Sequence, residues 1–184
     1  MKTRLTLFLI SLIFLASCKE PEVRRPVSYS KSHTLVATID PLKKVNSIEE
    51  RKIEEYIKRD STATYLVSPN GYWYQYLNKV DQESNTPKKG DIAELSYEIL
   101  DLNNQIIYSK EELGVKEYKV DKEDFIPALQ QGIKTMKKGE TIKFVIPSYS
   151  AFGVVGDNNK IGINESIISI VTIINIKENP ENEN

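Results

Sequence analysis

The sequence predicts an α+β domain in which one antiparallel β-sheet wraps around a single short helix. Strand-like segments dominate residues 64–177, and the only internal stripe of helical periodicity within that region lies between residues 125 and 136. The order of elements is three strands, one helix and two further strands, and we see no internal repeat. This order is typical of the α+β class rather than of alternating βαβ units.

The composition limits the chemistry that the chain can perform. It has 184 residues with 25 Lys and Arg against 26 Asp and Glu, so its net charge of −1 gives no electrostatic footprint for nucleic acid. A hydrophobic content of 40% is enough for a core and excludes full disorder. One cysteine and one histidine, His33, exclude a disulfide framework and a Cys- or His-built metal site. We therefore expect no metal site.

The first residues have the features of a targeting segment. Lys2 and Arg4 precede an apolar run over residues 5–16, which is too short for a bilayer core of about 30 Å and is typical of a signal peptide. The run ends in Leu-Ala-Ser-Cys at residues 15–18, which matches a bacterial lipobox. We expect a signal peptide at 1–17 and lipidation of Cys18, which would anchor the chain in the bacterial envelope. An ordinary signal peptide followed by an unrelated cysteine is the alternative.

A linker and a helix are expected next. Residues 18–45 contain three prolines and scattered charges without apolar periodicity, which indicates a tether. Residues 46–61 are expected to form a helix, because Ser47 and Glu50 fit a capping box. Ile53, Tyr56 and Ile57 form one apolar stripe on this helix. The stripe would pack on the following domain, or alternatively pair two copies of the chain.

The domain itself is expected over residues 62–178, followed by a polar tail at 179–184. Aromatic-rich strands at 65–67 and 72–77 flank a turn whose Gly71 permits a positive φ. We interpret these aromatic side chains as core and cross-strand pairs rather than as a surface for stacking bases or sugars. Residues 94–99 alternate between apolar and polar, which predicts a strand with one buried face, and a turn leads to a further strand at 105–108.

The second half supplies the helix and the remaining strands. Phe125, Leu129, Ile133 and Met136 share one helical face, and Gly139 closes the segment. A strand at 142–146 stops at a proline. The last strand, at 166–176, is rich in β-branched residues on both faces, which predicts a central position in the sheet.

Five motifs in register make this chain resemble the FK506-binding-protein (FKBP) family of peptidyl-prolyl cis/trans isomerases. They lie at residues 87–91, 125–133, 136–140, 146–153 and 166–173. The resemblance covers about residues 64–177, and with the lipobox, linker and helix it extends to the gliding-motility-associated lipoprotein isomerases. It implies an FKBP-like fold, isomerase activity without a cofactor, and X–Pro segments of envelope or exported proteins as partners.

The resemblance also implies which residues form the pocket. The catalytic set would be Tyr97, Phe152 and Ile126, whose backbone N–H holds a ligand carbonyl in the family. The substrate-binding set would be Ile107, Tyr108, Phe125, Leu129 and Ile161, with Tyr118 nearby. For Leu129 and Ile107, an ordinary core position is as good an interpretation as contact with substrate.

The chain departs from the family pattern at several pocket positions. Tyr108 stands where the family usually has an aspartate, and Phe152 stands where it usually has a tyrosine whose hydroxyl meets the ligand. Ala128 and Ser169 replace a glycine and an aromatic residue. These departures predict weakened binding of macrolides of the FK506 class, and they leave open whether the isomerase activity is weak.

The sequence leaves one functional alternative open and disfavours two others. A non-catalytic module could use the same pocket to hold a Pro-containing partner or to scaffold a membrane motility complex, and the pair Tyr108 and Phe152 does not decide between this and catalysis. A chaperone working through an inserted flap domain is disfavoured, because residues 153–165 form only a short loop. The acidic cluster at 121–124 is better explained by the dipole of the helix that follows than by acid–base catalysis.

Overall fold

The computed structural model describes residues 31–60, 62–81 and 84–180. The whole β-sheet lies within one compact unit that begins at residue 37. The predicted signal peptide at 1–17 and the lipidation site Cys18 lie outside the described residues. Within the described ranges, no helix combines the length and the apolar character needed to cross a bilayer.

Helix α2 is longer than the sequence predicts. It runs from Lys31 to Arg59 and contains Pro41, so the expected linker is wrong for residues 31–45. Proline usually interrupts a helix, but here the helix continues on both sides of Pro41 at the cost of a backbone hydrogen bond. The predicted capping box is wrong for the same reason. Ser47 lies inside the helix, where its Oγ donates to the Lys44 carbonyl at 2.9 Å.

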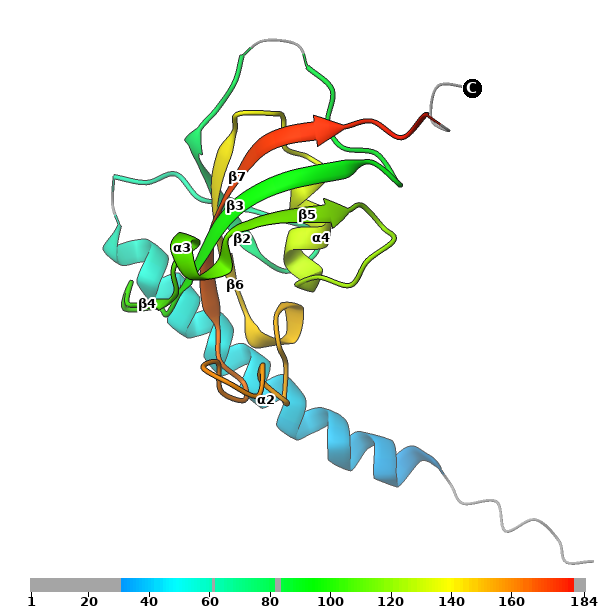
Figure 1. Cartoon of the computed structure of the whole chain (residues 1–184). Helices are drawn as coiled ribbons and strands as arrows, with labels where there is room; N and C mark the ends of the chain where they lie inside the picture. Colours follow the sequence, from blue (N-terminus) through cyan, green and yellow to red (C-terminus); the bar gives the residue numbers. More distant parts are fainter. Residues whose placement is uncertain (1–30, 61, 82–83, 181–184) are drawn as a thin grey trace, which may run out of the picture. The chain divides into compact units, whose positions relative to one another are not determined.

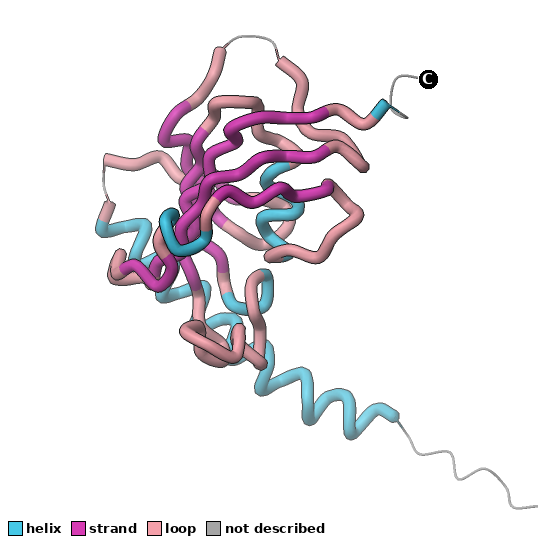
Figure 2. Tube along the Cα trace, viewed as in Figure 1, coloured by secondary structure: helices cyan, strands magenta, loops and turns pink. Residues whose placement is uncertain are grey.

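Seven strands form one antiparallel sheet in the order β1-β2-β6-β7-β3-β4, with β5 also paired to β3. Their bounds are β1 Leu66–Val67, β2 Trp73–Asn78, β3 Ile92–Leu100, β4 Ile106–Tyr108, β5 Val115–Lys119, β6 Thr141–Ile146 and β7 Ile167–Lys177. Strand β7 pairs with both β3 and β6, which confirms the predicted central position of the last strand. Figure 1 shows β7, β3 and β5 side by side, and Figure 2 shows the strands as one set, with short helices in the connections.

Two elements were not predicted from the sequence. Strand β5 lies on the edge of the sheet, and within it only Tyr118 is fully buried, so its apolar alternation is too weak to predict a strand. Helix α3, Lys110–Leu113, is a single turn capped by Ser109, whose Oγ accepts a hydrogen bond from the Glu112 N–H. Both elements pack against β3, and α3 contributes Leu113 to the wall of the cavity described below.

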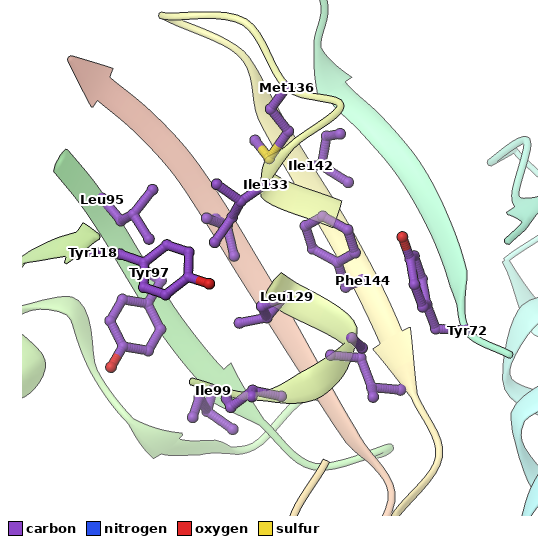
Figure 3. Close-up of a cluster of buried hydrophobic side chains, with 14 of the residues drawn as sticks. Tyr72, Leu95, Tyr97, Ile99, Tyr118, Leu129, Ile133, Met136, Ile142 and Phe144 are labelled. Atoms are coloured by element: carbon purple, nitrogen blue, oxygen red, sulfur yellow. The ribbon is translucent and has the colours of Figure 1, made fainter. Parts of the chain in front are cut away.

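The main core lies between the sheet and helix α4, Pro127–Ile133. This helix is shorter than the predicted helical stripe, because Phe125 and Met136 lie outside it and it ends before the predicted stop at Gly139. Figure 3 shows Leu129 and Ile133 of α4 directed at side chains from β3 and β6, including Leu95 and Phe144. Gly132 permits this close packing, because a Cβ at that position would lie 2.4 Å from a ring carbon of Phe144. The alternation over β3 buries Ala93, Leu95, Tyr97 and Ile99 on this face, as predicted.

The opposite face of the sheet carries a second apolar cluster. Ile53 and Tyr56 of α2 pack there with Leu100, Val145 and Ile168 from three strands. This confirms that the apolar stripe of the helix covers the domain. The observed architecture is the predicted one, a single antiparallel sheet around a short helix, with a second helix on its other face.

Candidate active site

A cavity of about 400 Å³ opens where the ends of several elements converge. Residues from β3, β4, α3, the start of α4 and the loop after the 3₁₀ helix η2, Ser148–Ser150, form its walls. The lining residues are Tyr97, Ile99, Tyr108, Leu113, Asp124, Phe125, Ile126, Pro127, Ala151, Phe152 and Asp157. Most of these side chains are aromatic or aliphatic, so the cavity suits an apolar group of modest size.

Aromatic rings form one wall of the cavity. Tyr97 and Phe125 meet edge to face, with ring centroids 5.4 Å apart and an interplanar angle of 89°. Tyr118 supports Phe125 from β5, with centroids 5.5 Å apart. Such pairs stabilise one another beyond the area they bury. Burial raises the pKa of Tyr97, which is the expected effect of an environment that excludes water.

A break in the edge of the sheet creates room for the cavity. Strands β4 and β5 pair with different parts of the same edge of β3, and α3 lies between them in sequence. The helix ends at Gly114, whose φ of 65° lets the chain turn back into β5. The excursion places Tyr108 and Leu113 on the cavity wall.

Asp157 supplies an acidic group to the cavity wall that the sequence does not predict. The Tyr108 hydroxyl donates to Asp157 Oδ2 at 2.5 Å, and it accepts a hydrogen bond from Asn159 Nδ2 at 2.9 Å. Asp157 Oδ1 accepts from the backbone N–H groups of Asn159 and Ile161. Although Tyr108 stands where the family resemblance implies an aspartate, the cavity therefore has a carboxylate beside Tyr108, supplied by the loop that follows Phe152.

Lys160 fastens the same loop to β4 and α3. Its Nζ donates to the Ile107 carbonyl at 3.2 Å, pairs with Glu112 at 2.5 Å and lies 4.6 Å from the centroid of the Tyr108 ring. Residues 157–161 are thus held against the sheet edge by several polar contacts. This fixes the side of the cavity that carries Asp157.

Five of the eight predicted pocket residues line the cavity, namely Tyr97, Tyr108, Phe125, Ile126 and Phe152. The other three do not lie on its wall. Leu129 and Ile161 are buried in the main core. The Leu129 side chain faces the sheet rather than the cavity. Ile107 is half-buried at the core's margin.

Six lining residues were missed by the sequence analysis: Ile99, Leu113, Asp124, Pro127, Ala151 and Asp157. A signal existed for Ile99, which lies two residues after Tyr97 and therefore on the same face of β3. Asp157 has no local signal, because its contact with Tyr108 spans 49 residues. Among the described residues, no group of three or more His, Cys, Asp or Glu side chains could hold a metal ion.

The Tyr108 contact should be measurable as a change in the Asp157 pKa. Partial burial alone would raise that pKa, but the hydrogen bonds from Tyr108 and from the Ile161 and Asn159 N–H groups lower it below its ordinary value. The charged carboxylate therefore stabilises the folded loop above the unfolded pKa of about 3.9, and this contribution is lost as the pH falls through the folded pKa. In Tyr108→Phe, we expect the Asp157 pKa to rise toward its ordinary value in a carboxyl NMR titration. An unchanged pKa would contradict the assigned contact.

The structure combines an antiparallel sheet, one short helix packed on a face of that sheet, and an aromatic cavity at the start of the helix. This combination is typical of FKBP-like proteins. The profile of the family described as FKBP-type peptidyl-prolyl cis-trans isomerase matches residues 83–174, half of the chain. The chain belongs to this family, and it is a peptidyl-prolyl cis-trans isomerase of the FKBP type. A comparison with curated protein sequences found no match.

Solved structures share the fold at low sequence identity. FkpA from Escherichia coli is 20% identical with a TM-score of 0.60, over 98% of this chain and 84% of that one. A peptidyl-prolyl cis-trans isomerase from Pseudomonas syringae pv. tomato is 15% identical with a TM-score of 0.60, over 74% and 96%. The N-terminal domain of FKBP42 from Arabidopsis thaliana is 19% identical with a TM-score of 0.56, over 63% and 94%.

Proposed function

We propose that the chain is a lipid-anchored isomerase of the bacterial envelope that assists the folding of exported or gliding-motility proteins, with the aromatic cavity as its active site. The observation that carries the assignment of the site is the convergence of Tyr97, Phe125 and Phe152 around a cavity of about 400 Å³. This space suits a prolyl ring and the peptide bond before it.

The reaction needs no nucleophile, metal or proton transfer. Rotation about an X–Pro bond has a barrier of about 18–20 kcal/mol, because the amide loses its resonance when it is twisted. The twisted carbonyl carries less charge than the planar one, so it loses less by leaving water. An apolar wall therefore favours the twisted state over the planar substrate, and this difference in binding lowers the barrier.

Each part of the cavity has a role in this proposal. The rings of Tyr97, Phe125 and Phe152 would grip the prolyl ring and thereby fix which bond rotates. Ile126 directly precedes α4 and lies on the wall, so its backbone N–H would donate to the substrate carbonyl. Every 1.36 kcal/mol of preferential binding to the twisted state gives about tenfold in rate.

The polar side chains of the lining serve mainly to hold the cavity walls in position. Phe152 has no hydroxyl, so this wall offers the substrate an apolar surface rather than a hydrogen-bond donor. The contact between Tyr108 and Asp157 holds the loop that follows Phe152. The cavity would therefore recognise X–Pro segments chiefly by apolar contact.

The envelope location is supported by the N-terminal sequence. The only cysteine of the chain, Cys18, stands at the end of the lipobox, directly after the apolar run of the signal peptide. Several acyl chains on one residue are sufficient for stable membrane anchoring. The isomerase would then act on the periplasmic or the surface side of a membrane, where newly exported chains fold.

Removing the lipidated cysteine tests this location. In bacteria that process lipoproteins, we expect the wild-type chain to incorporate a labelled fatty acid and to sediment with membranes. Cys18→Ser should lose the label and at least about tenfold of the membrane-bound fraction, because the acyl chains are the only anchor proposed. Ser17→Ala keeps a small residue before the cysteine and should retain the label. Undiminished labelling of Cys18→Ser would contradict the proposed anchor.

A further inference from the structure

Glu49 is a buried carboxylate that the isomerase reaction does not use. It lies on α2, outside the residues that match the family, and its exposed fraction is only 4%. One carboxylate oxygen accepts from the Ser148 backbone N–H at 2.6 Å and from Ser166 Oγ at 3.0 Å. The other accepts from Ser148 Oγ at 2.7 Å. A buried charge is tolerated when its oxygens are hydrogen-bonded in this way, and such bonds are geometrically demanding.

Ser148 is the base of the turn that carries a wall of the cavity. Its carbonyl accepts hydrogen bonds from the N–H groups of Ala151 and Gly153, both at 2.8 Å. These two residues flank Phe152, and both Ala151 and Phe152 line the cavity. The position of Ser148 therefore sets the position of the Phe152 backbone.

Ser166 stands at the other end of the same loop, directly before β7. The residues between Ser148 and Ser166 include Phe152 and Asp157, so both ends of the segment that supplies these two residues meet on one carboxylate. The Asn164 N–H also donates to the Gly153 carbonyl at 2.9 Å, which ties the two ends of the loop to each other.

The helix that presents Glu49 is itself fixed to the domain. Ile53, one turn further along α2, is fully buried in the second apolar cluster, and Tyr56 packs beside it. Tyr56 also donates its hydroxyl hydrogen to Asn104 Oδ1 at 3.0 Å. Glu49 thus acts from a rigid element, which is what accurate placement of a distant loop requires.

We propose that Glu49 is a positioning residue of the isomerase, which holds the loop between Ser148 and Ser166 in the conformation that places Phe152 on the cavity wall. This inference rests on the proposed active site. It makes α2 a working part of the enzyme, although the helix lies outside the family match and contributes no residue to the cavity lining.

Three substitutions in the full chain test this role. Glu49→Ala removes all three acceptor contacts, and Glu49→Gln retains one acceptor oxygen and replaces the other by a donor. Glu50→Gln is the matched control, because Glu50 is the next residue and accepts from the exposed Tyr149 hydroxyl at 3.0 Å. For each variant, kcat and KM with an X–Pro peptide are measured at a temperature where all variants are folded, together with amide hydrogen exchange.

We expect Glu49→Ala to lower kcat/KM by about tenfold or more, since displacing a binding wall by about 1 Å has effects of this size. The Ala151 and Gly153 amides should exchange faster, whereas amides in the β3–β7 pairing should keep their protection. Glu49→Gln should lie between wild type and Glu49→Ala. Glu50→Gln should keep kcat/KM within about twofold, because surface contacts of this kind contribute little.

Three outcomes would overturn the proposal: an unchanged kcat/KM in Glu49→Ala, a loss matched by Glu50→Gln, or a loss of protection spread evenly over the sheet. If Glu49→Ala does not fold, Ser166→Ala removes a single hydrogen bond from the same carboxylate and should show the same local exchange with a smaller loss of kcat/KM. A wild-type chain without isomerase activity would refute the proposed function, whereas the exchange pattern at Ala151 and Gly153 would still report on the Glu49 contacts.

Discussion

Replacing Leu129 by alanine is expected to lower the free energy of unfolding by about 2–5 kcal/mol. Leu129 has no exposed surface and belongs to the core between α4 and the sheet. Its removal leaves a cavity under the first turn of a short helix, and the neighbouring strands cannot collapse far into that space. Urea unfolding of both proteins, followed by circular dichroism, measures the difference.

A volume-conserving variant serves as the control for this prediction. Leu129→Met keeps an apolar side chain of similar size, so it should cost less than about 1.5 kcal/mol. A loss below about 1 kcal/mol in Leu129→Ala would mean that the side chain is not packed as described. Such a result would favour contact between Leu129 and the substrate, the other interpretation that the sequence allows.

Replacing Tyr97 by alanine is expected to lower kcat/KM for X–Pro peptides by about 10- to 100-fold. The substitution removes one face of the aromatic wall, and loss of a buried aromatic contact is worth about 1.5–3 kcal/mol. Phe125 also loses its edge-to-face partner. A protease-free isomerisation assay measures the change, at a temperature where the variant is folded.

Tyr97→Phe separates the ring from its hydroxyl. The phenylalanine ring keeps the contact with Phe125, so we expect kcat/KM to stay within about threefold of wild type, which corresponds to one hydrogen bond at the weak end of the usual range. Equal losses in Tyr97→Ala and Tyr97→Phe would assign the role to the hydroxyl group. Full activity in a folded Tyr97→Ala protein would show that catalysis takes place elsewhere.

Much of the fold could be predicted, because the sequence patterns that indicate its main elements involve residues close together in the chain. The alternation along β3, the β-branched last strand and the apolar stripe of α4 each depend on residues close in sequence. Strand β5 and helix α3 lack such a pattern, because one is a mostly exposed edge strand and the other a single turn. The early start of α2 could not be predicted, because the prolines before residue 46 and the lack of apolar periodicity there indicate a linker.

The candidate site was predictable only in part, and for a related reason. Phe125 and Phe152 belong to motifs with a recognisable order along the chain, and Tyr97 lies on the alternating strand that follows the motif at residues 87–91. The polar contacts depend on chain segments that meet only after folding, since Tyr108 reaches Asp157 across 49 residues and Glu49 reaches Ser148 across 99. No pattern in the sequence pairs these residues, so the carboxylate at the cavity and the support of its wall by α2 required the structure.

The measurement that tests the central claim most directly is a protease-free prolyl isomerisation assay on lipid-free residues 19–184 with Leu-Pro and Phe-Pro peptides. Uncatalysed exchange takes tens to hundreds of seconds, so acceleration is readily seen. We expect catalytic amounts of the protein to accelerate exchange, and Tyr97→Ala to remove most of that acceleration. A folded wild-type protein that leaves the rate unchanged would contradict the account, and the cavity would then be a site that only binds Pro-containing segments.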